Sequence, residues 1–183
     1  MKFLIASDIH GSEYFCTKLV DAFHREKADK LLLLGDLLYH GPRNDLPDVY
    51  APKKVIDMLN GLRDKIFCVR GNCDCEVDQM VLNFPIMADY GLIEQCGKTI
   101  FATHGHRYNL DNPPLLNKGD VLLHGHTHVP AKIVTNTFVY INCGSVSIPK
   151  QNSRHSYLTL ENGLFLFKDL DGEVFDSYDM KQD

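Results

Sequence analysis

Short apolar runs alternate with helical repeats along the first third of the chain. An unbroken apolar run is typical of a strand buried on both faces, whereas apolar residues three and four positions apart are typical of a helix with one buried face. This pattern predicts strands at 2–7, 30–34 and 66–69 and helices at 12–25 and 53–62. The order strand, helix, strand, helix, strand predicts a parallel sheet with helices packed on its faces.

The rest of the chain contains shorter strands separated by turn residues. Three pairs of strands have the spacing of hairpins, and the turn at Asn162-Gly163 is the strongest of these signals. The expected pairs are 91–95 with 99–102, 133–134 with 138–141, and 156–160 with 164–167, and one further strand covers 121–123. The sequence has no linker, repeat or low-complexity segment. We therefore expect an α/β fold with two packed mixed sheets and flanking helices, in a single domain over 1–183.

Charge and hydropathy exclude some classes of protein. The formal net charge is −5, which argues against stable binding to nucleic acid or to an anionic membrane. The apolar start of the chain is too short for a signal peptide, and no apolar run approaches the ~18 residues of a membrane span. We therefore expect a cytoplasmic protein that makes no membrane contact, and cysteines in the reduced state.

Polar residues with metal-binding side chains follow several of the predicted strands. Asp8, Asp36 and Asn72 each follow a strand of the predicted parallel sheet, and ligands bind beyond the carboxyl ends of such strands. Five of the nine histidines fall within 104–128, and neutral imidazole is the commonest metal ligand in proteins. Two divalent cations need a bridging carboxylate, several imidazoles and a neutral oxygen donor. The chain supplies each kind of donor in Asp8, His10, Asp36, Asn72, His104, His126 and His128.

Five motifs between residues 8 and 128 carry a family resemblance. They are Asp8-x-His10, Gly35-Asp36, Gly71-Asn72, Thr103-His104-Gly105-His106 and Gly125-His126-Thr127-His128. In this order they resemble the five blocks of the calcineurin-like metallophosphoesterase superfamily. The small size and the stretch over 35–44 further resemble the YfcE-type bacterial phosphodiesterase family. The turn at Asn142-Cys143-Gly144-Ser145 resembles the Asn-Pro-Gly-Ser turn of that family.

The resemblance implies a four-layer α/β/β/α sandwich with a dinuclear metal centre. It assigns Asp8, His10, Asp36 and His128 to one metal ion and Asp36, Asn72, His104 and His126 to the other, so that Asp36 bridges them. A metal-bridging hydroxide would be the nucleophile for in-line attack on a phosphodiester. The resemblance favours Mn²⁺, and the same donors also suit Zn²⁺, Fe and Mg²⁺.

One position departs from the superfamily pattern. Most members have a histidine after the Gly-Asn motif, where this chain has Cys73 followed by Asp74. That histidine is usually given the role of stabilising the transition state or protonating the leaving group, and a thiol cannot supply the charge of an imidazolium. A monoester dianion brings more negative charge than a diester, so we expect a preference for diesters. We predict that Cys73 and Asp74 act in catalysis together with Asp36 and Asn72. The alternatives for Asp74 are that it orients a metal ligand or caps the following helix.

Three more residues are expected to bind the substrate. Arg43 lies in the long loop over 39–52, which must border the site, and arginine can form bidentate hydrogen bonds with phosphate. His40 and His106 are the other two candidates. For His106, and for His124, the alternative is that the imidazole orients a metal ligand.

Three functions fit this set of residues. The first is a phosphodiesterase acting on a small-molecule diester, and the second is a phosphomonoesterase or nucleotidase that uses the same site. The third is a non-catalytic, protein-binding scaffold of the same fold. Scaffolds of the superfamily lose metal-binding histidines, and this chain retains them, so we expect an enzyme. The β-rich second half also offers a sheet edge for a homo-oligomer.

Overall fold

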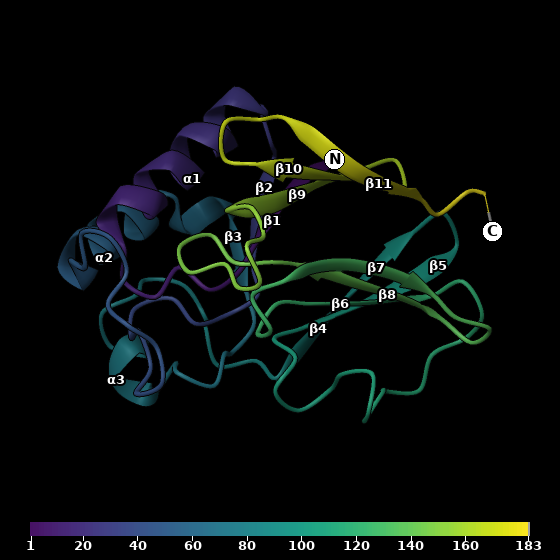
Figure 1. Ribbon diagram of the computed structural model, residues 1–183, viewed down its shortest axis with the longest axis horizontal. Helices are drawn as coiled ribbons and strands as arrows, with labels where there is room; N and C mark the ends of the chain where they lie inside the picture. The colour runs from purple at the N-terminus through teal and green to yellow at the C-terminus, as the bar shows by residue number, and fades with distance from the viewer. Residues whose placement is uncertain (183) are drawn as a thin grey trace.

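Neighbouring side chains of strand β1 (Lys2–Ala6) pack into different layers of the protein. The computed structural model describes residues 1–182, in which two β-sheets pack face to face and helices cover the outer side of the first sheet (Figure 1). Leu4 and Ala6 belong to the core beneath the helices, whereas Phe3 and Ile5 belong to the core between the two sheets. A strand buried on both faces requires the continuous apolar run that the sequence shows.

The first sheet contains six strands in the order β11-β10-β9-β1-β2-β3. Its first three strands along the chain are parallel, and its last three add to them in antiparallel pairs. Helices α1 and α2 cover its outer face. The bounds are α1 (Glu13–Arg25), β2 (Lys30–Leu33), α2 (Pro52–Gly61), β3 (Ile66–Cys68), β9 (Ser156–Glu161), β10 (Leu164–Asp169) and β11 (Val174–Asp179).

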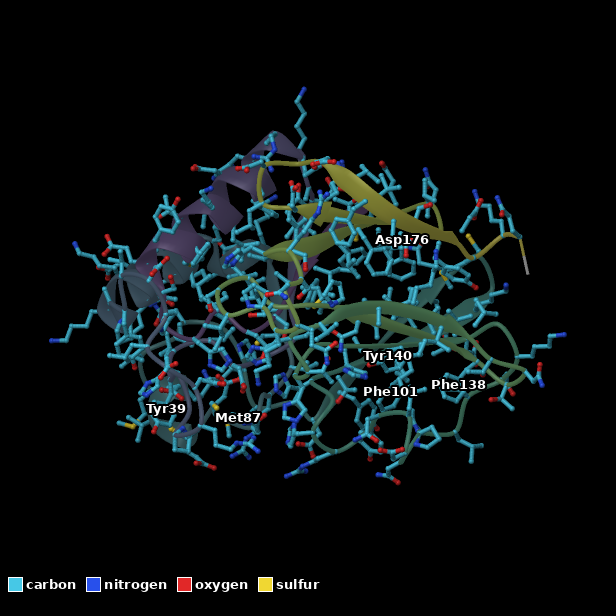
Figure 2. All side chains as sticks on the ribbon, in the orientation of Figure 1. Tyr39, Met87, Phe101, Phe138, Tyr140 and Asp176 are labelled. Carbon is cyan, nitrogen blue, oxygen red and sulfur yellow. The ribbon has the colours of Figure 1, made fainter. Side chains whose placement is uncertain are left out.

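The second sheet contains five strands in the order β4-β5-β6-β8-β7. Its three central strands are parallel, and β4 and β7 pair antiparallel at its edges. Phe101, Phe138 and Tyr140 pack together on its outer face with Leu122 (Figure 2), where Tyr108 covers them. The bounds are β4 (Tyr90–Gln95), β5 (Lys98–Thr103), β6 (Val121–His124), β7 (Pro130–Val134) and β8 (Val139–Cys143).

The predicted α/β class with two packed mixed sheets is confirmed, and every predicted strand and helix corresponds to an observed element. Helices α1 and α2 cover only the first sheet. The outer face of the second sheet is covered by a non-helical segment that includes Tyr108 and Leu116. Three elements were not predicted, namely the 3₁₀ turn at Arg63–Lys65, the short helix α3 (Glu76–Gln79) and the edge strand β11. Within residues 1–182 the longest helix, α1, has 13 residues, and none could cross a membrane.

Candidate metal centre

The loops that follow five parallel strands carry the seven predicted metal ligands. Asp8 and His10 come after β1, Asp36 after β2, Asn72 after β3, His104 after β5, and His126 and His128 after β6. Five of these residues have a positive φ, between 49° and 65°, which is uncommon for residues other than glycine: Asp8, His10, Asp36, His126 and His128. Strained backbone of this kind gathers at functional sites, where the surrounding structure holds it in place.

Two glycines let these loops approach one another closely. A Cβ atom on Gly71 would collide with the side chain of Asp36, and one on Gly125 would collide with Ser7 and Asp8. The glycines of the Gly-Asn and Gly-His motifs therefore leave the space that the two carboxylates occupy.

The first group of donors consists of Asp8, His10 and His128, all of which are buried. Nδ1 of His10 donates a hydrogen bond to the carbonyl oxygen of Tyr39 at 2.7 Å, and Nδ1 of His128 donates to that of Ile148 at 2.7 Å. Because a carbonyl carries no proton, each Nδ1 must, and each neutral ring then presents a bare lone pair at Nε2. The two Nε2 atoms lie 3.4 Å apart, and Oδ1 of Asp8 lies 3.5 Å from one and 3.2 Å from the other.

The second group contains His104, Asn72 and His126. Nδ1 of His104 donates to the carbonyl oxygen of Leu34 at 2.7 Å, which leaves Nε2 facing the site. This Nε2 lies 3.0 Å from Oδ1 of Asn72 and 3.1 Å from Nδ1 of His126. Asp36 stands between the groups, because its Oδ2 lies 3.4 Å from Nε2 of His104 and 3.7 Å from Nε2 of His10.

The donors in both groups fit divalent cations. Lone pairs of ring nitrogens and carboxylate oxygens point at one another at close range. Among the described residues, Oδ1 of Asp8 is buried and has no hydrogen-bond partner. Imidazoles, carboxylates and one amide oxygen form a set that suits Mn²⁺, Zn²⁺, Fe and Mg²⁺. Burial by itself would lower the pKa of His104, but Asp36 and Asp8 raise it to about 9. Two carboxylates thus attract positive charge to the position that a metal ion would take.

Asp74 lies beneath this centre, where its carboxylate binds backbone rather than facing the metal ligands. Oδ2 accepts hydrogen bonds from the backbone N–H of Asp36 at 2.9 Å and of Gly71 at 2.7 Å, and Oδ1 accepts one from Leu37 at 2.9 Å. Burial raises the pKa of Asp74, and these three N–H groups oppose that change. Asp74 therefore fixes the loops after β2 and β3 relative to each other. The helix-cap alternative is wrong, because the N-cap of α3 is Cys75.

Cys73 lies at the edge of the centre as a neutral thiol. Its backbone N–H donates to Oδ1 of Asp36 at 2.8 Å, and its Sγ lies 3.2 Å from Nδ2 of Asn72. Burial, followed by the charge of Asp36, raises the pKa of the Cys73 thiol to about 12. The side chain therefore supplies no charge near neutral pH.

The candidate substrate residues occupy three different environments. Arg43 lines a small cavity of about 40 Å³ together with Asp36, Asn72 and His128. The ring of His106 lies 5.5 Å from that of His104, centroid to centroid, so it borders the second group. By contrast, the ring of His40 packs edge-on against Tyr39 and Tyr50, with centroids 4.8 and 5.3 Å away.

His124 supports the loops from behind. Its Nδ1 donates to the carbonyl oxygen of Gly125 at 2.9 Å, and a Cβ atom on Gly105 would collide with its ring. The imidazole therefore packs against the backbone of both histidine motifs.

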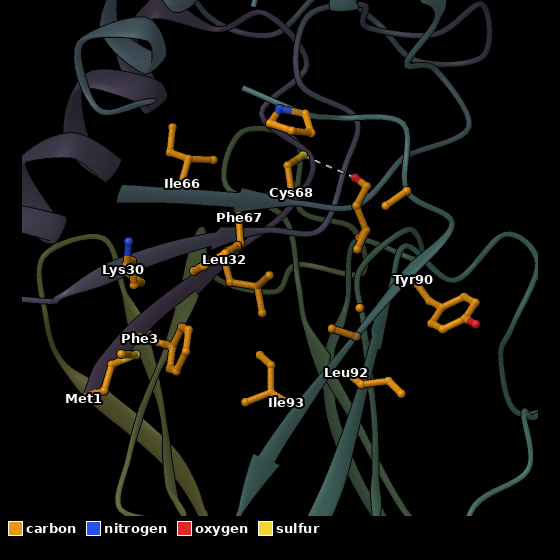
Figure 3. A pocket seen from close by; sticks show the side chains of 15 residues that line it. Met1, Phe3, Lys30, Leu32, Ile66, Phe67, Cys68, Tyr90, Leu92 and Ile93 are labelled. Carbon is orange, nitrogen blue, oxygen red and sulfur yellow. Dashed lines mark hydrogen bonds between the residues drawn. The ribbon is translucent and has the colours of Figure 1, made fainter. Parts of the chain in front are cut away.

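A larger cavity, of about 480 Å³, lies away from the predicted ligands. It opens between the edge strands β3 and β4, and Figure 3 shows Phe67, Leu92 and Ile93 among its apolar lining side chains. None of the predicted site residues lines it. Its walls include Lys30 and Tyr90 but no carboxylate or imidazole that could hold a metal ion, so the small polar cavity at the predicted ligands is the better candidate for the active site.

Comparison with known proteins decides the family. The family model for the calcineurin-like phosphoesterase superfamily domain matches residues 1–163. The chain belongs to the calcineurin-like phosphoesterase superfamily. It is 47% identical to phosphodiesterase YfcE of Escherichia coli (strain K12) over 162 residues, which are 88% of each chain. The resemblance that the five motifs carry is thereby confirmed.

Two solved structures extend the comparison within the calcineurin-like phosphoesterase superfamily fold. The structure of YfcE, a phosphoesterase from E. coli, aligns with a TM-score of 0.94 at 43% identity and covers 98% of this chain and 100% of that one. Wild-type Vps29 complexed with zinc from Entamoeba histolytica aligns with a TM-score of 0.62 at 18% identity, over 98% and 99% of the two chains. The second likeness shows the fold alone.

Sequence reasoning missed several residues at the site of this superfamily member. Lys150 lines the same small cavity as Arg43, and its backbone N–H donates to the carbonyl oxygen of His128 at 3.0 Å. Ser145 and Ser147 each donate a hydroxyl hydrogen bond of 3.0 Å to the carbonyl oxygen of Asp8. The turn at Asn142-Cys143-Gly144-Ser145 was the available signal, because it directs the segment with all three residues past Asp8 and His128.

Proposed function

We propose that the chain is a metal-dependent phosphodiesterase that hydrolyses small phosphodiesters with two divalent metal ions. The observation that carries this proposal is the position of Asp36, whose Oδ2 lies within 3.7 Å of both His10 and His104, one from each donor group. A carboxylate in that position is suited to bridge two ions. The 47% identity to phosphodiesterase YfcE supports the same class of reaction.

The proposed ligands divide between the two ions as the two donor groups do. Asp8, His10, Asp36 and His128 would hold one ion, and Asp36, Asn72, His104 and His126 would hold the other. Mn²⁺ is our first choice, with Zn²⁺, Fe and Mg²⁺ as alternatives. When bound, the ions would activate a water molecule and neutralise phosphoryl oxygens.

The residues of the chain supply orientation and charge for this reaction. Carbonyl oxygens of Tyr39, Leu34 and Ile148 fix the rings of three histidines with Nε2 directed into the site. Hydrogen bonds of this kind set the tautomer and the direction of a ligating imidazole. Asp74 acts on the centre as a positioning residue, because it holds the backbone of Asp36.

The residue at position 73 favours a diester. Arg43 and Lys150 provide two cations that can pair with the phosphoryl group of either ester, whereas Cys73 supplies no charge where most superfamily members have an imidazole. A phosphodiester carries one negative charge, and a phosphomonoester dianion carries two that must be stabilised. We therefore propose that diesters are preferred over monoesters, and that Arg43 binds the phosphoryl group.

A matrix of metals and substrates tests this function. Metal-free protein is loaded with Mn²⁺, Zn²⁺, Fe²⁺ or Mg²⁺ and given bis(p-nitrophenyl) phosphate or p-nitrophenyl phosphate. We expect hydrolysis of the diester, highest with Mn²⁺ and absent after chelation. His128→Ala should abolish it, whereas His24→Ala, which changes an exposed histidine of α1, should not. Bound metal without turnover in any combination would favour the scaffold function.

A further inference from the structure

A third cavity, which we call the tyrosine cavity, shares the lining residue Cys73 with the small polar one. Its volume is about 380 Å³, and it lies between the loop that contains Tyr39 and Tyr50 and helices α2 and α3. Cys73 lines this cavity and also the polar cavity that contains Asp36 and His128. The two spaces are therefore neighbours on either side of one small side chain.

The metal centre itself leaves little room for a substrate beyond the phosphoryl group. Its cavity measures about 40 Å³, against about 380 Å³ for the neighbouring cavity. A diester with its phosphoryl group at the metal ligands must place its ester groups outside this space. The tyrosine cavity, which Cys73 also lines, is adjacent to that point.

The lining of the tyrosine cavity is mostly apolar and aromatic, with Lys53 and Asp78 as its charged residues. Leu38, Ile56, Val77 and Val81 contribute aliphatic surface, with Val77 and Val81 exposed to solvent. Tyr39 and Tyr50 contribute aromatic rings, and the ring of His40 packs edge-on against both of them. Aromatic side chains bind other rings in offset-stacked or edge-to-face arrangements. Figure 2 shows Tyr39 beside α3, among the loops at that end of the protein.

The wall of this cavity is tied directly to the metal centre. The carbonyl oxygen of Tyr39 accepts the 2.7 Å hydrogen bond from Nδ1 of His10, so one residue both orients a proposed ligand and lines the apolar space. The other tyrosine is held through the backbone, because Tyr50 forms a β-bridge with Ser12. The backbone of both tyrosines is thus tied to the segment that carries Asp8 and His10.

We propose that this cavity binds an aromatic ester group of the substrate, while the phosphoryl group lies at the metal centre. The substrate class is then a phosphodiester in which at least one ester group carries an aromatic ring. This inference rests on the proposed phosphodiesterase function. Cys73 lines both spaces, and its thiol takes up less room there than the imidazole of most superfamily members would.

Binding of two phosphonates separates the roles of the cavity and the metal centre. Phenylphosphonate and methylphosphonate carry the same anionic group and contain no ester bond to hydrolyse, so calorimetry with the Mn²⁺-loaded protein measures binding alone. We expect phenylphosphonate to bind about tenfold more tightly, as burial of part of an aromatic ring implies. In Tyr39→Ala, which keeps the backbone carbonyl that orients His10, this ratio should fall to within about twofold.

Tyr14→Ala is the matched control, because Tyr14 is 46% exposed on α1 and Tyr39 is 43% exposed. It should keep the tenfold ratio. If Tyr39→Ala fails to fold, Val77→Asp places a charge in the same cavity and should lower the ratio equally. Equal affinity for the two phosphonates in the wild type, or an unchanged ratio in the folded cavity variants, would overturn the proposal.

If bis(p-nitrophenyl) phosphate is still hydrolysed in that case, the phosphodiesterase function stands and only the cavity assignment falls. Absence of both hydrolysis and phosphonate binding would remove both.

Discussion

Replacing Asp74 with asparagine tests whether this buried carboxylate holds the metal centre together. The carboxylate accepts three backbone hydrogen bonds, from Asp36, Leu37 and Gly71. An amide keeps only one acceptor oxygen, so in either orientation its NH₂ group faces at least one buried N–H. Hydrogen bonds to a charged group contribute about 1.5–3 kcal/mol each, and the remaining bonds become neutral ones. We expect Asp74→Asn to lower the free energy of unfolding by about 2–4 kcal/mol.

The assay combines urea unfolding with metal binding. The loss of stability should be accompanied by weaker binding of Mn²⁺, because the backbone of Asp36 loses its anchor while every proposed ligand is still present. Asp57→Asn is the control, because Asp57 is exposed on α2. If folded Asp74→Asn matched the wild type in both stability and Mn²⁺ affinity, the assigned positioning role would be refuted.

Three other changes have defined outcomes. Cys73→His should raise monoester turnover relative to diester turnover about tenfold or more, since it adds a proton donor and positive charge, and an unchanged ratio would remove the argument for diester preference. Lys150→Ala should lower kcat/KM for the diester about tenfold because a cation at the cavity is lost, and Lys150→Arg should restore most of kcat/KM. An equal loss of kcat/KM in both variants would mean that Lys150 acts by something other than its charge. Hydrogen bonds from Lys168, Lys2 and Tyr157 outweigh burial and lower the pKa of Glu26 to about 2 from its ordinary 4.5. The ionised carboxylate of Glu26 therefore stabilises the fold by roughly 3 kcal/mol above pH ~4.5, and this stability is lost as the pH falls through about 2. Urea unfolding of Glu26→Gln should show the difference at pH 7 and little of it at pH 2, and a difference that is constant with pH would contradict it.

The sequence predicted the placement of residues that follow parallel strands. Asp8, Asp36 and Asn72 follow three neighbouring strands. Parallel strands bring the residues after their carboxyl ends to one edge of the sheet, whatever the length of the segments between the strands. The apolar pattern of buried strands was equally readable, because both faces of β1 and β2 lie in cores. Local chemistry and sheet geometry thus decide most of the predicted ligand set.

Features that depend on contacts between segments far apart in the chain could not be predicted from the sequence. Lys150 reaches the cavity because its loop is bonded to the backbone of His128, a contact that no local pattern encodes. The ring of His40 packs between two tyrosines, one of them ten residues away. Helix α3 has only four residues, which is too short for a helical repeat, and β11 is an edge strand with mostly partly exposed side chains.

The central claim is that two metal ions share Asp36. The direct test is a calorimetric titration of metal-free protein with Mn²⁺, with bound metal counted per chain by elemental analysis. We predict two ions per wild-type chain, weaker binding of both in Asp36→Ala, and weaker binding of only one in Asn72→Ala. Saturation at one ion per chain, or an Asp36→Ala variant that keeps one site at wild-type affinity, would contradict the account.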